Sequence, residues 1–335
     1  MSCRQWVTAA ALLLAACGGS KNGPTPVANP PQIACPADVA VHGVTGASQA
    51  VSFDPPTVTG GTQPVNVTCA KPSGSTFPLG TTANSCAAND SAGRQASCSF
   101  NVVLSGQALS VSKFDTVGDS LTEGENGLPT PSFVDPPNSY PTKLKALLDA
   151  NYPGQTTLVN RGHGGDRIEK TRDDIHGFML TDRPGAVLIL GGFNNLTSPC
   201  SVGRANTTAC GDAISDVAFG VRDCIREVKE ANVGVKYIFA STLTPPGAFV
   251  PGPGISDHRI DGDAIARANT KIKQMVALEG AILVDPYPAF IGHESEFVSV
   301  DGLHLQPAGY QKLADTFFAS IMSNVAQTPL STVLR

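Results

Sequence analysis

Five short apolar runs alternate with five helical patterns over the last two thirds of the chain, and this alternation limits the fold most. We expect strands near residues 112–117, 156–160, 186–191, 235–241 and 281–285. Helical patterns lie near 139–151, 167–177, 212–231, 259–279 and 307–323. Strands that alternate with helices run parallel, because each helix carries the chain back across the sheet. The sequence therefore predicts a three-layer, doubly wound α/β domain with helices on both faces of a parallel sheet.

The segment before this domain has a different pattern. From residue 33 to about 104, short β-prone runs are separated by Gly and Pro, and no helical period occurs; the runs lie at 39–41, 50–53, 65–69 and 97–104. These features predict a small β-sandwich. The segment also contains Cys35, Cys69, Cys86 and Cys98. In an oxidising compartment, four clustered cysteines predict two disulfides, and their spacing leaves all three connectivities open.

Three more cysteines lie in the C-terminal domain. Cys200 and Cys210 flank a polar loop and are placed to close it. Cys224 lies in an apolar-periodic helix, where we expect a buried thiol.

The first 16 residues predict a secretory signal. Arg4 precedes a short apolar stretch at 6–16 that is too short to span a bilayer and ends in small residues. Leu14-Ala15-Ala16-Cys17 resembles the bacterial lipobox, in which the cysteine becomes the lipidated first residue; the alternative is a plain signal peptide that contains a cysteine. Residues 17–32 are rich in Pro and predict a flexible linker. We therefore expect an exported chain, anchored through Cys17 to a membrane of the bacterial cell envelope.

Composition excludes several classes of protein. Hydrophobic residues make up 41% of the chain, which is enough to bury a core and excludes wholesale disorder. Lys and Arg total 23 against 28 Asp and Glu, so no basic excess exists to neutralise phosphates, and we expect no nucleic-acid partner. No run of about 18 apolar residues follows residue 16, which excludes an ordinary multi-span membrane protein.

Four motifs carry the candidate chemistry, and each of the first three follows a predicted strand. Gly118-Asp119-Ser120-Leu121 places a serine where the backbone turns sharply into a helix. Asn160-Arg161-Gly162-His163-Gly164-Gly165-Asp166 is a Gly-rich turn whose N–H groups can approach a ligand. Gly191-Gly192-Phe193-Asn194-Asn195 puts an amide side chain at the carboxyl end of a buried strand. Asp301-Gly302-Leu303-His304 holds a carboxylate and an imidazole within reach of a hydrogen bond.

These four blocks, in this order over residues 114–307, resemble the SGNH-hydrolase superfamily, also called GDSL esterases and lipases. The resemblance implies a five-stranded sheet of flavodoxin-like order. It also implies that Ser120 is the nucleophile and that His304 is the general base, oriented by Asp301. The N–H groups of Ser120 and Gly162 and the Asn194 side chain would form the oxyanion hole, and Asp119 would be structural.

The third block departs from the family pattern at one position. Asn195 stands where Asp is commoner, which puts the local support of that loop in question. We expect no cofactor and no metal, because the six histidines are scattered without ligand spacing. Asp257 and His258 lie near a Gly/Pro-rich insertion, where solvation of the loop is favoured over catalysis.

The N-terminal segment resembles a HYR domain, an immunoglobulin-like module of extracellular proteins. The resemblance rests on Cys35-Pro36 and on the sequence around Cys69, Cys86 and Cys98. It implies a spacer, or a module that contacts a glycan or a protein. The expected organisation is a signal peptide at 1–16, a linker at 17–32, a HYR-like β-sandwich at 33–106 and an SGNH hydrolase domain at 110–326.

Two functional classes follow. The favoured one is a lipid-anchored serine esterase acting on carboxylic esters such as acyl lipids, lysophospholipids or acetylated glycans. The alternative is a surface adhesion or carbohydrate-binding protein with a degenerate hydrolase domain. The complete set of Ser120, Gly162, Asn194 and His304 argues against that alternative, because a decayed site has no chemical need for all four.

Overall fold

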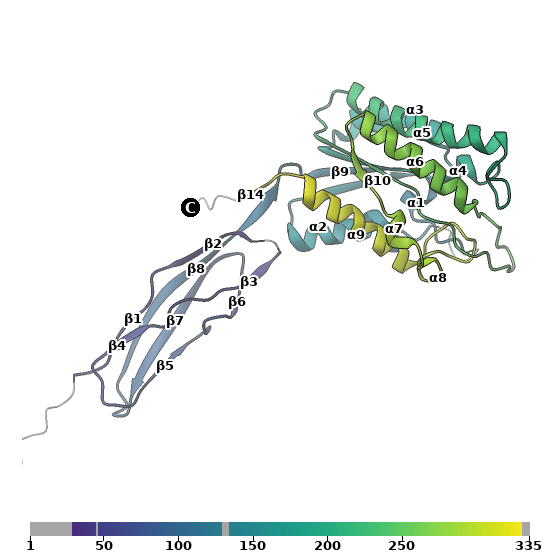
Figure 1. Cartoon of the computed structure of the whole chain (residues 1–335). Helices are drawn as coiled ribbons and strands as arrows, with labels where there is room; N and C mark the ends of the chain where they lie inside the picture. Colours follow the sequence, from purple (N-terminus) through teal and green to yellow (C-terminus); the bar gives the residue numbers. More distant parts are fainter. Residues whose placement is uncertain (1–28, 45, 129–133, 330–335) are drawn as a thin grey trace, which may run out of the picture. The chain divides into compact units, whose positions relative to one another are not determined.

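The computed structural model describes residues 29–44, 46–128 and 134–329 (Figure 1). The expected signal peptide at 1–16, Cys17 and most of the linker lie outside these residues. The described residues fall into two compact units. One is made of residues within 1–37, 52–73 and 83–101, and the other of residues within 38–51, 74–82 and 102–335. The domain boundaries expected at 33–106 and 110–326 stay predictions.

Paired β-strands make up most of the described N-terminal part of the chain. β1 (Gln32–Ala34) pairs with β4 (Thr57–Thr59), and β3 (Ser48–Ala50) pairs with β6 (Thr76–Pro78). The main sheet has the order β14-β8-β7-β5, and β2 pairs with β8 in parallel. Its strands are β2 (Val39–Val44), β5 (Val65–Cys69), β7 (Gly80–Asp90), β8 (Gln95–Leu109) and β14 (Gln327–Pro329). The β-rich, immunoglobulin-like architecture predicted here is confirmed.

Two disulfides join the strands of this part. Cys35 is bonded to Cys98, and Cys69 is bonded to Cys86, its register partner between β5 and β7. Such bonds stabilise a small domain by restricting its unfolded chain.

The cysteines of the C-terminal domain also match their predictions. Cys200 and Cys210 are bonded and close a short loop. Cys224 is a buried free thiol.

The C-terminal domain is built on a five-stranded parallel sheet. Its strands are β9 (Lys113–Gly118), β10 (Thr157–Gly162), β11 (Ala186–Leu190), β12 (Tyr237–Ser241) and β13 (Ile282–Val284). They lie in the order β10-β9-β11-β12-β13, with every pair parallel. This is the flavodoxin-like order implied by the resemblance. All five residues of β11 are buried, as a central strand covered on both faces requires.

Helices cover both faces of this sheet (Figure 1). On one face, α5 (Thr208–Glu230) packs against α3 (Ile168–Asp182) and α6 (Gly262–Leu278). On the other face, α2 (Tyr140–Asn151) packs against α9 (Pro307–Asn324), where the rings of Tyr140 and Phe317 stack with their centroids 5.0 Å apart. The three-layer prediction is therefore confirmed, and the five predicted helices match these five closely.

Short helical turns carry the residues of interest. α1 (Ser120–Glu123) follows β9, and α4 (Phe193–Leu196) follows β11, both at the carboxyl edge of the sheet. Open α/β sheets bind their ligands at this edge. The remaining short helices are η1 (Pro136–Asn138), α7 (Tyr287–Phe290) and α8 (Glu294–Phe297).

Within residues 29–44, 46–128 and 134–329, none of the helices has the length and apolarity that crossing a bilayer requires.

Candidate active site

Ser120 is the first residue of α1, directly after β9. Gly118 ends β9 in close contact with the neighbouring strand β11. A Cβ atom on Gly118 would lie 1.7 Å from the carbonyl oxygen of Leu190. Asp119 then caps α1, and its side chain accepts the N–H of Leu121 at 3.2 Å. This tight turn brings the Ser120 side chain to the carboxyl edge of the sheet.

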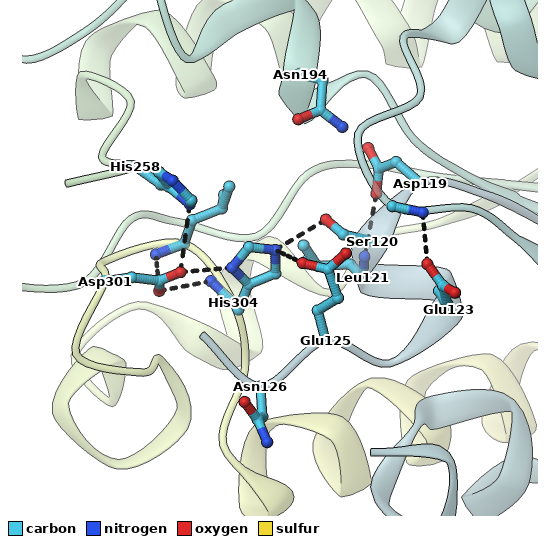
Figure 2. Close-up of polar contacts among 12 residues, drawn as sticks. Asp119, Ser120, Leu121, Glu123, Glu125, Asn126, Asn194, His258, Asp301 and His304 are labelled. Atoms are coloured by element: carbon cyan, nitrogen blue, oxygen red, sulfur yellow. Dashed lines mark hydrogen bonds and ion pairs between the residues drawn. The ribbon is translucent and has the colours of Figure 1, made fainter. Parts of the chain in front are cut away.

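Ser120, His304 and Asp301 form a continuous chain of hydrogen bonds (Figure 2). The Nε2 atom of His304 lies 2.9 Å from Ser120 Oγ. The Nδ1 atom of the same ring lies 2.5 Å from Asp301 Oδ2. The three residues are separated by up to 184 positions in the chain, and all are buried. The structure thus brings together the serine, the histidine and the aspartate that the sequence singles out.

Asp301 is held in its ionised form. Burial alone would raise the pKa of its carboxyl, but hydrogen bonds from His258 and His304 hold that pKa well below its usual range. Its Oδ1 atom also accepts the main-chain N–H groups of Leu303 at 3.0 Å and His304 at 3.1 Å. A carboxylate fixed in this way keeps the hydrogen of the His304 ring on Nδ1, which leaves Nε2 free to act as a base toward Ser120.

Asn194 lies in α4, across the site from Ser120 (Figure 2). Its Nδ2 atom donates to the main-chain oxygen of Asp166 at 2.9 Å, which joins the loop after β11 to the loop after β10. An amide nitrogen carries two hydrogens, so one of them remains for a ligand.

Asn195, the departure from the family pattern, supports these same loops. Its Oδ1 atom accepts the N–H of Ile168 at 2.9 Å. Its Nδ2 atom donates to both carboxylate oxygens of Glu169 at 2.9 and 3.0 Å. The amide therefore links the α4 turn to the start of α3, and the loop is firmly supported despite the substitution.

The assignment of Gly162 to the oxyanion hole is corrected by the structure. The Gly162 N–H donates to Asn160 Oδ1 at 2.9 Å, and a Cβ atom at this position would lie 2.2 Å from the main-chain nitrogen of Glu123. Gly162 therefore serves the close packing of β10 against α1. Gly165, three residues later, lines the cavity that contains Ser120.

That cavity has a volume of about 190 Å³. Its lining residues come from all four sequence blocks and from three positions outside them: Ser120, Glu125, Gly165, Asn194, Thr197, His258, Leu303 and His304. Polar and charged side chains dominate this lining. The cavity is thus a small polar pocket directly over the Ser120–His304 pair.

Sequence reasoning did not assign two of these residues, Glu125 and His258, to the site. Glu125 Oε2 lies 3.3 Å from His304 Nε2, although nothing in the GDS motif indicates a role for it. His258 Nδ1 lies 3.5 Å from Asp301 Oδ2, and its ring meets the His304 ring edge to face. Loop solvation, which the sequence favours over catalysis for His258, does not account for these contacts. The one available signal was the proximity of Glu125 to Ser120 in the chain.

Three of the site residues lie close enough together to be considered as ligands of one metal ion. His258, Asp301 and His304 have nitrogen and oxygen atoms within 4.8 Å of one another. Two ligands of a tetrahedral zinc ion lie about 3.3 Å apart, given metal–ligand bonds of about 2.0 Å. Asp301 Oδ2 and His304 Nδ1 are only 2.5 Å apart, which fits a hydrogen-bonded pair rather than two ligands of one ion.

A larger cleft of about 270 Å³ lies between the end of β10 and α3, and neither Ser120 nor His304 lines it. Two of its basic side chains are bound within the protein. Arg161 donates two hydrogen bonds to Asp182, and Lys170 forms an ion pair with Asp174. Among the described residues that line this cleft, no nucleophile is paired with a base, so the smaller cavity is the candidate active site.

Comparisons with solved structures find several proteins to which this chain is similar. A lipase/acylhydrolase from Enterococcus faecalis is 19% identical, covers 64% of this chain and 97% of its own, and has a TM-score of 0.48. An acetylxylan esterase from Geobacillus stearothermophilus is 20% identical, and the match covers 63% of this chain and 94% of the esterase, with a TM-score of 0.47. An alpha/beta hydrolase enzyme from the metagenome of Lake Arreo is 20% identical, and the match covers 64% of this chain and 95% of that enzyme, with a TM-score of 0.47.

No curated protein matches the chain. Family models match both parts of it. Residues 28–104 match the HYR domain, and residues 116–312 match the GDSL-like lipase/acylhydrolase family. The second match covers more than half of the chain and includes every residue of the cavity. The chain therefore belongs to the GDSL-like lipase/acylhydrolase family and carries an HYR domain before its hydrolase domain.

Proposed function

We propose that this protein is a serine esterase in which Ser120 attacks the ester carbonyl, His304 transfers the proton and Asp301 orients His304. The observation that carries this proposal is the continuous hydrogen-bond chain from Ser120 Oγ to Asp301. A serine hydroxyl is a weak nucleophile until a base within about 2.6–3.2 Å takes its proton. The 2.9 Å separation of Ser120 Oγ and His304 Nε2 meets this requirement.

In the first half of the reaction, the Ser120 oxygen bonds to the carbonyl carbon while its proton passes to His304 Nε2. The imidazolium then gives this proton to the alcohol oxygen as the carbon–oxygen bond breaks, which leaves Ser120 acylated. In the second half, water takes the place of the alcohol, and the acid is released. Asp301 stays ionised throughout and stabilises the imidazolium through Nδ1.

We assign the oxyanion hole to the N–H groups of Ser120 and Gly165 and to the amide of Asn194. All three residues line the cavity. The hydrogen bond from Asn194 to Asp166 fixes the amide, so it does not reorganise when negative charge develops. One such donor commonly contributes about 3–4 kcal/mol of transition-state stabilisation.

The cavity favours short acyl groups on a polar alcohol. A volume of about 190 Å³ holds an acetyl or a similarly small group together with part of the alcohol. Among the described residues of its lining, Leu303 is the one aliphatic hydrocarbon side chain. A long acyl chain needs an extended apolar surface. We therefore favour acetylated glycans and similar small esters over the acyl lipids and lysophospholipids that the sequence also allows.

The cellular setting is a further part of the proposal. The lipobox at Leu14-Ala15-Ala16-Cys17 supports export and a lipid anchor on the bacterial cell envelope. The three disulfides support an oxidising compartment. In this setting the HYR domain acts as a spacer between the membrane and the esterase, or contacts a glycan or protein surface.

The alternative, an adhesion protein with a degenerate hydrolase domain, is not favoured by any contact in the site. The triad geometry and the fixed Asn194 amide have no purpose in a decayed enzyme.

A chain-length series tests the proposal. The full-length protein is assayed on p-nitrophenyl acetate, butyrate and octanoate, with Ser120→Ala as the matched inactive variant. We expect the highest kcat/KM on acetate, a fall of about tenfold or more by octanoate, and no enzymatic turnover by Ser120→Ala. A preference for octanoate contradicts the short-acyl assignment, and absence of turnover on all three esters contradicts the esterase itself.

A further inference from the structure

Glu125 lies beside the reacting histidine, and the triad mechanism gives it no role. Gly124 ends α1 with φ at 107°, in the left-handed region, and so turns the chain back toward the cavity. The Glu125 N–H then donates to the carbonyl oxygen of Ser120 at 3.0 Å, and its own carbonyl oxygen accepts from the Tyr310 hydroxyl. These bonds fix the Glu125 backbone next to the nucleophile.

The carboxylate of Glu125 contacts the same ring nitrogen that faces Ser120 (Figure 2). Glu125 Oε2 lies 3.3 Å from His304 Nε2, and the Glu125 side chain is only 15% exposed. Its other oxygen lies against Gly164, where a Cβ atom would be 1.9 Å from Oε1. A residue with any side chain at position 164 would displace the carboxylate, so the loop after β10 is shaped to receive it.

This contact has a different energy before and during the reaction. A carboxylate accepts hydrogen bonds and donates none. In the resting enzyme Nε2 accepts the Ser120 hydroxyl, and its lone pair gives Glu125 nothing to bind. Once Ser120 attacks, Nε2 carries a hydrogen and the ring a positive charge, so the Glu125 carboxylate attracts both. An interaction that forms only as the transition state is reached raises kcat.

Resting on the esterase function proposed above, we propose that Glu125 is a second catalytic carboxylate, which binds the Nε2–H of His304 while Ser120 attacks the ester. The proton passes from Ser120 Oγ to Nε2 as the oxygen–carbon bond forms. It then passes from Nε2 to the alcohol oxygen as the ester bond breaks. Glu125 neither gains nor loses a proton in either step; it supplies negative charge at the nitrogen where the proton resides.

The surroundings of Glu125 predict a pH dependence for this role. Burial raises the pKa of Glu125. The positive charges of His304 and His258 lower this pKa, and the negative charges of Glu123 and Asp301 raise it further. These groups come from α1, from the loop before α6 and from the segment before α9. Glu125 therefore takes up a proton at a higher pH than an exposed glutamate does, and the neutral carboxyl then donates to Nε2 in competition with the Ser120 hydroxyl.

Two variants separate charge from shape in the full-length protein. Glu125→Gln keeps the shape and removes the charge, whereas Glu125→Asp keeps the charge on a shorter side chain. We measure kcat and KM for p-nitrophenyl acetate from pH 5 to 9. For Glu125→Gln we expect kcat to fall about tenfold with KM within about twofold, and the acid limb of the rate profile to move about 0.5 unit or more to lower pH.

Glu125→Asp is expected to retain more activity than Glu125→Gln and to keep the wild-type acid limb. A merely structural role predicts the opposite order, because glutamine matches the shape of glutamate. Glu296→Gln removes one carboxylate from the exposed helix α8 and is the control; we expect it to match the wild type.

Wild-type kcat together with an unmoved acid limb in Glu125→Gln overturns the inference. Higher activity in Glu125→Gln than in Glu125→Asp overturns it as well. Both outcomes require a wild type that hydrolyses the ester, so they differ from failure of the esterase function, in which the wild type itself is inactive. Circular dichroism melts of each variant confirm that the compared proteins are folded.

Discussion

The Asp119 carboxylate accepts the main-chain N–H of Gly192 at 3.1 Å, across the gap between the turns that follow β9 and β11. The same oxygen accepts the N–H of Phe193 at 3.2 Å. Asp119 precedes Ser120, the proposed nucleophile, and Phe193 precedes Asn194, the amide of the proposed oxyanion hole. One buried carboxylate therefore fixes the spacing of two functional groups that are more than 70 residues apart in the chain.

Replacement of Asp119 by alanine is expected to affect both stability and catalysis. It removes the cap of α1 and leaves the buried N–H groups of Gly192 and Phe193 without their acceptor, at a cost of about 2–4 kcal/mol. Because Ser120 and Asn194 then lose their common support, kcat/KM should fall about 100-fold. Thermal melts and steady-state kinetics on p-nitrophenyl acetate measure the two effects.

Asp261→Ala is the matched control, because Asp261 caps α6 with the same type of bond. It should lower the melting temperature while kcat/KM stays within about twofold. An Asp119→Ala variant with wild-type turnover would show that Asp119 does not hold the site.

Removal of the Asn194 amide tests the corrected oxyanion hole. Asn194→Ala should lower kcat about 100- to 1,000-fold with KM changed by less than about threefold, because the amide acts on charge that develops in the transition state. Asn324→Ala, at the exposed end of α9, removes an amide of the same kind and should leave kcat unchanged. A rise in KM with unchanged kcat in Asn194→Ala would assign the residue to substrate binding instead.

Asp115 gives a pH-dependent prediction about stability. It is fully buried in β9, and burial, together with the neighbouring Asp182 carboxylate, raises its pKa to about 7. The unfolded chain releases this proton near pH 4, whereas the folded chain holds it until about pH 7. Stability from this group is therefore fully present below pH 4 and is lost as the pH rises through 7.

Asp115→Asn does not titrate and should avoid that loss. We expect its melting temperature to exceed that of the wild type by roughly 3 °C or more at pH 8, and by clearly less at pH 5. Differential scanning calorimetry at the two pH values measures this difference. An equal effect at both would show that Asp115 stays ionised in the folded protein.

The sequence predicted the architecture well where its physical signal is local. The apolar run from Ala186 to Leu190 and the periodic helix around Cys224 are visible without a structure, because burial selects their side chains directly. Strand β7 (Gly80–Asp90) was missed because it consists of small and polar residues. Its pairing with β5 and β8 and the Cys69–Cys86 bond place it in the sheet.

The candidate site was predictable in its motifs but not in its contacts. The turn after Asn160 contains three glycines, and the sequence alone does not tell which N–H faces the cavity. The Gly162 N–H is bound to Asn160 and Gly165 lines the cavity, which supports Gly165 as the proposed donor. His258 and Glu125 enter the site only through tertiary packing, which brings the loop before α6 and the end of α1 to one histidine.

Anchoring depends on a residue outside the described part of the chain. Cys17→Ser removes the lipidation site of the proposed lipobox. We expect the variant to leave the membrane fraction and appear in the soluble exported fraction, because the acyl chains supply the apolar surface that holds the protein to a bilayer. Immunoblots of fractionated cells measure this shift, and a variant that still needs detergent for extraction would contradict the anchor.

Covalent labelling shows whether Ser120 is a nucleophile that His304 activates. A fluorophosphonate is added to the full-length protein, and residual turnover of p-nitrophenyl acetate is followed together with the mass of each tryptic peptide. We expect one label, on Ser120, that appears in parallel with the loss of activity. We also expect Ser120→Ala to stay unlabelled, with turnover reduced about 1,000-fold or more. Labelling at another residue, or a folded Ser120→Ala variant that keeps about a tenth of wild-type turnover, would contradict this role of Ser120.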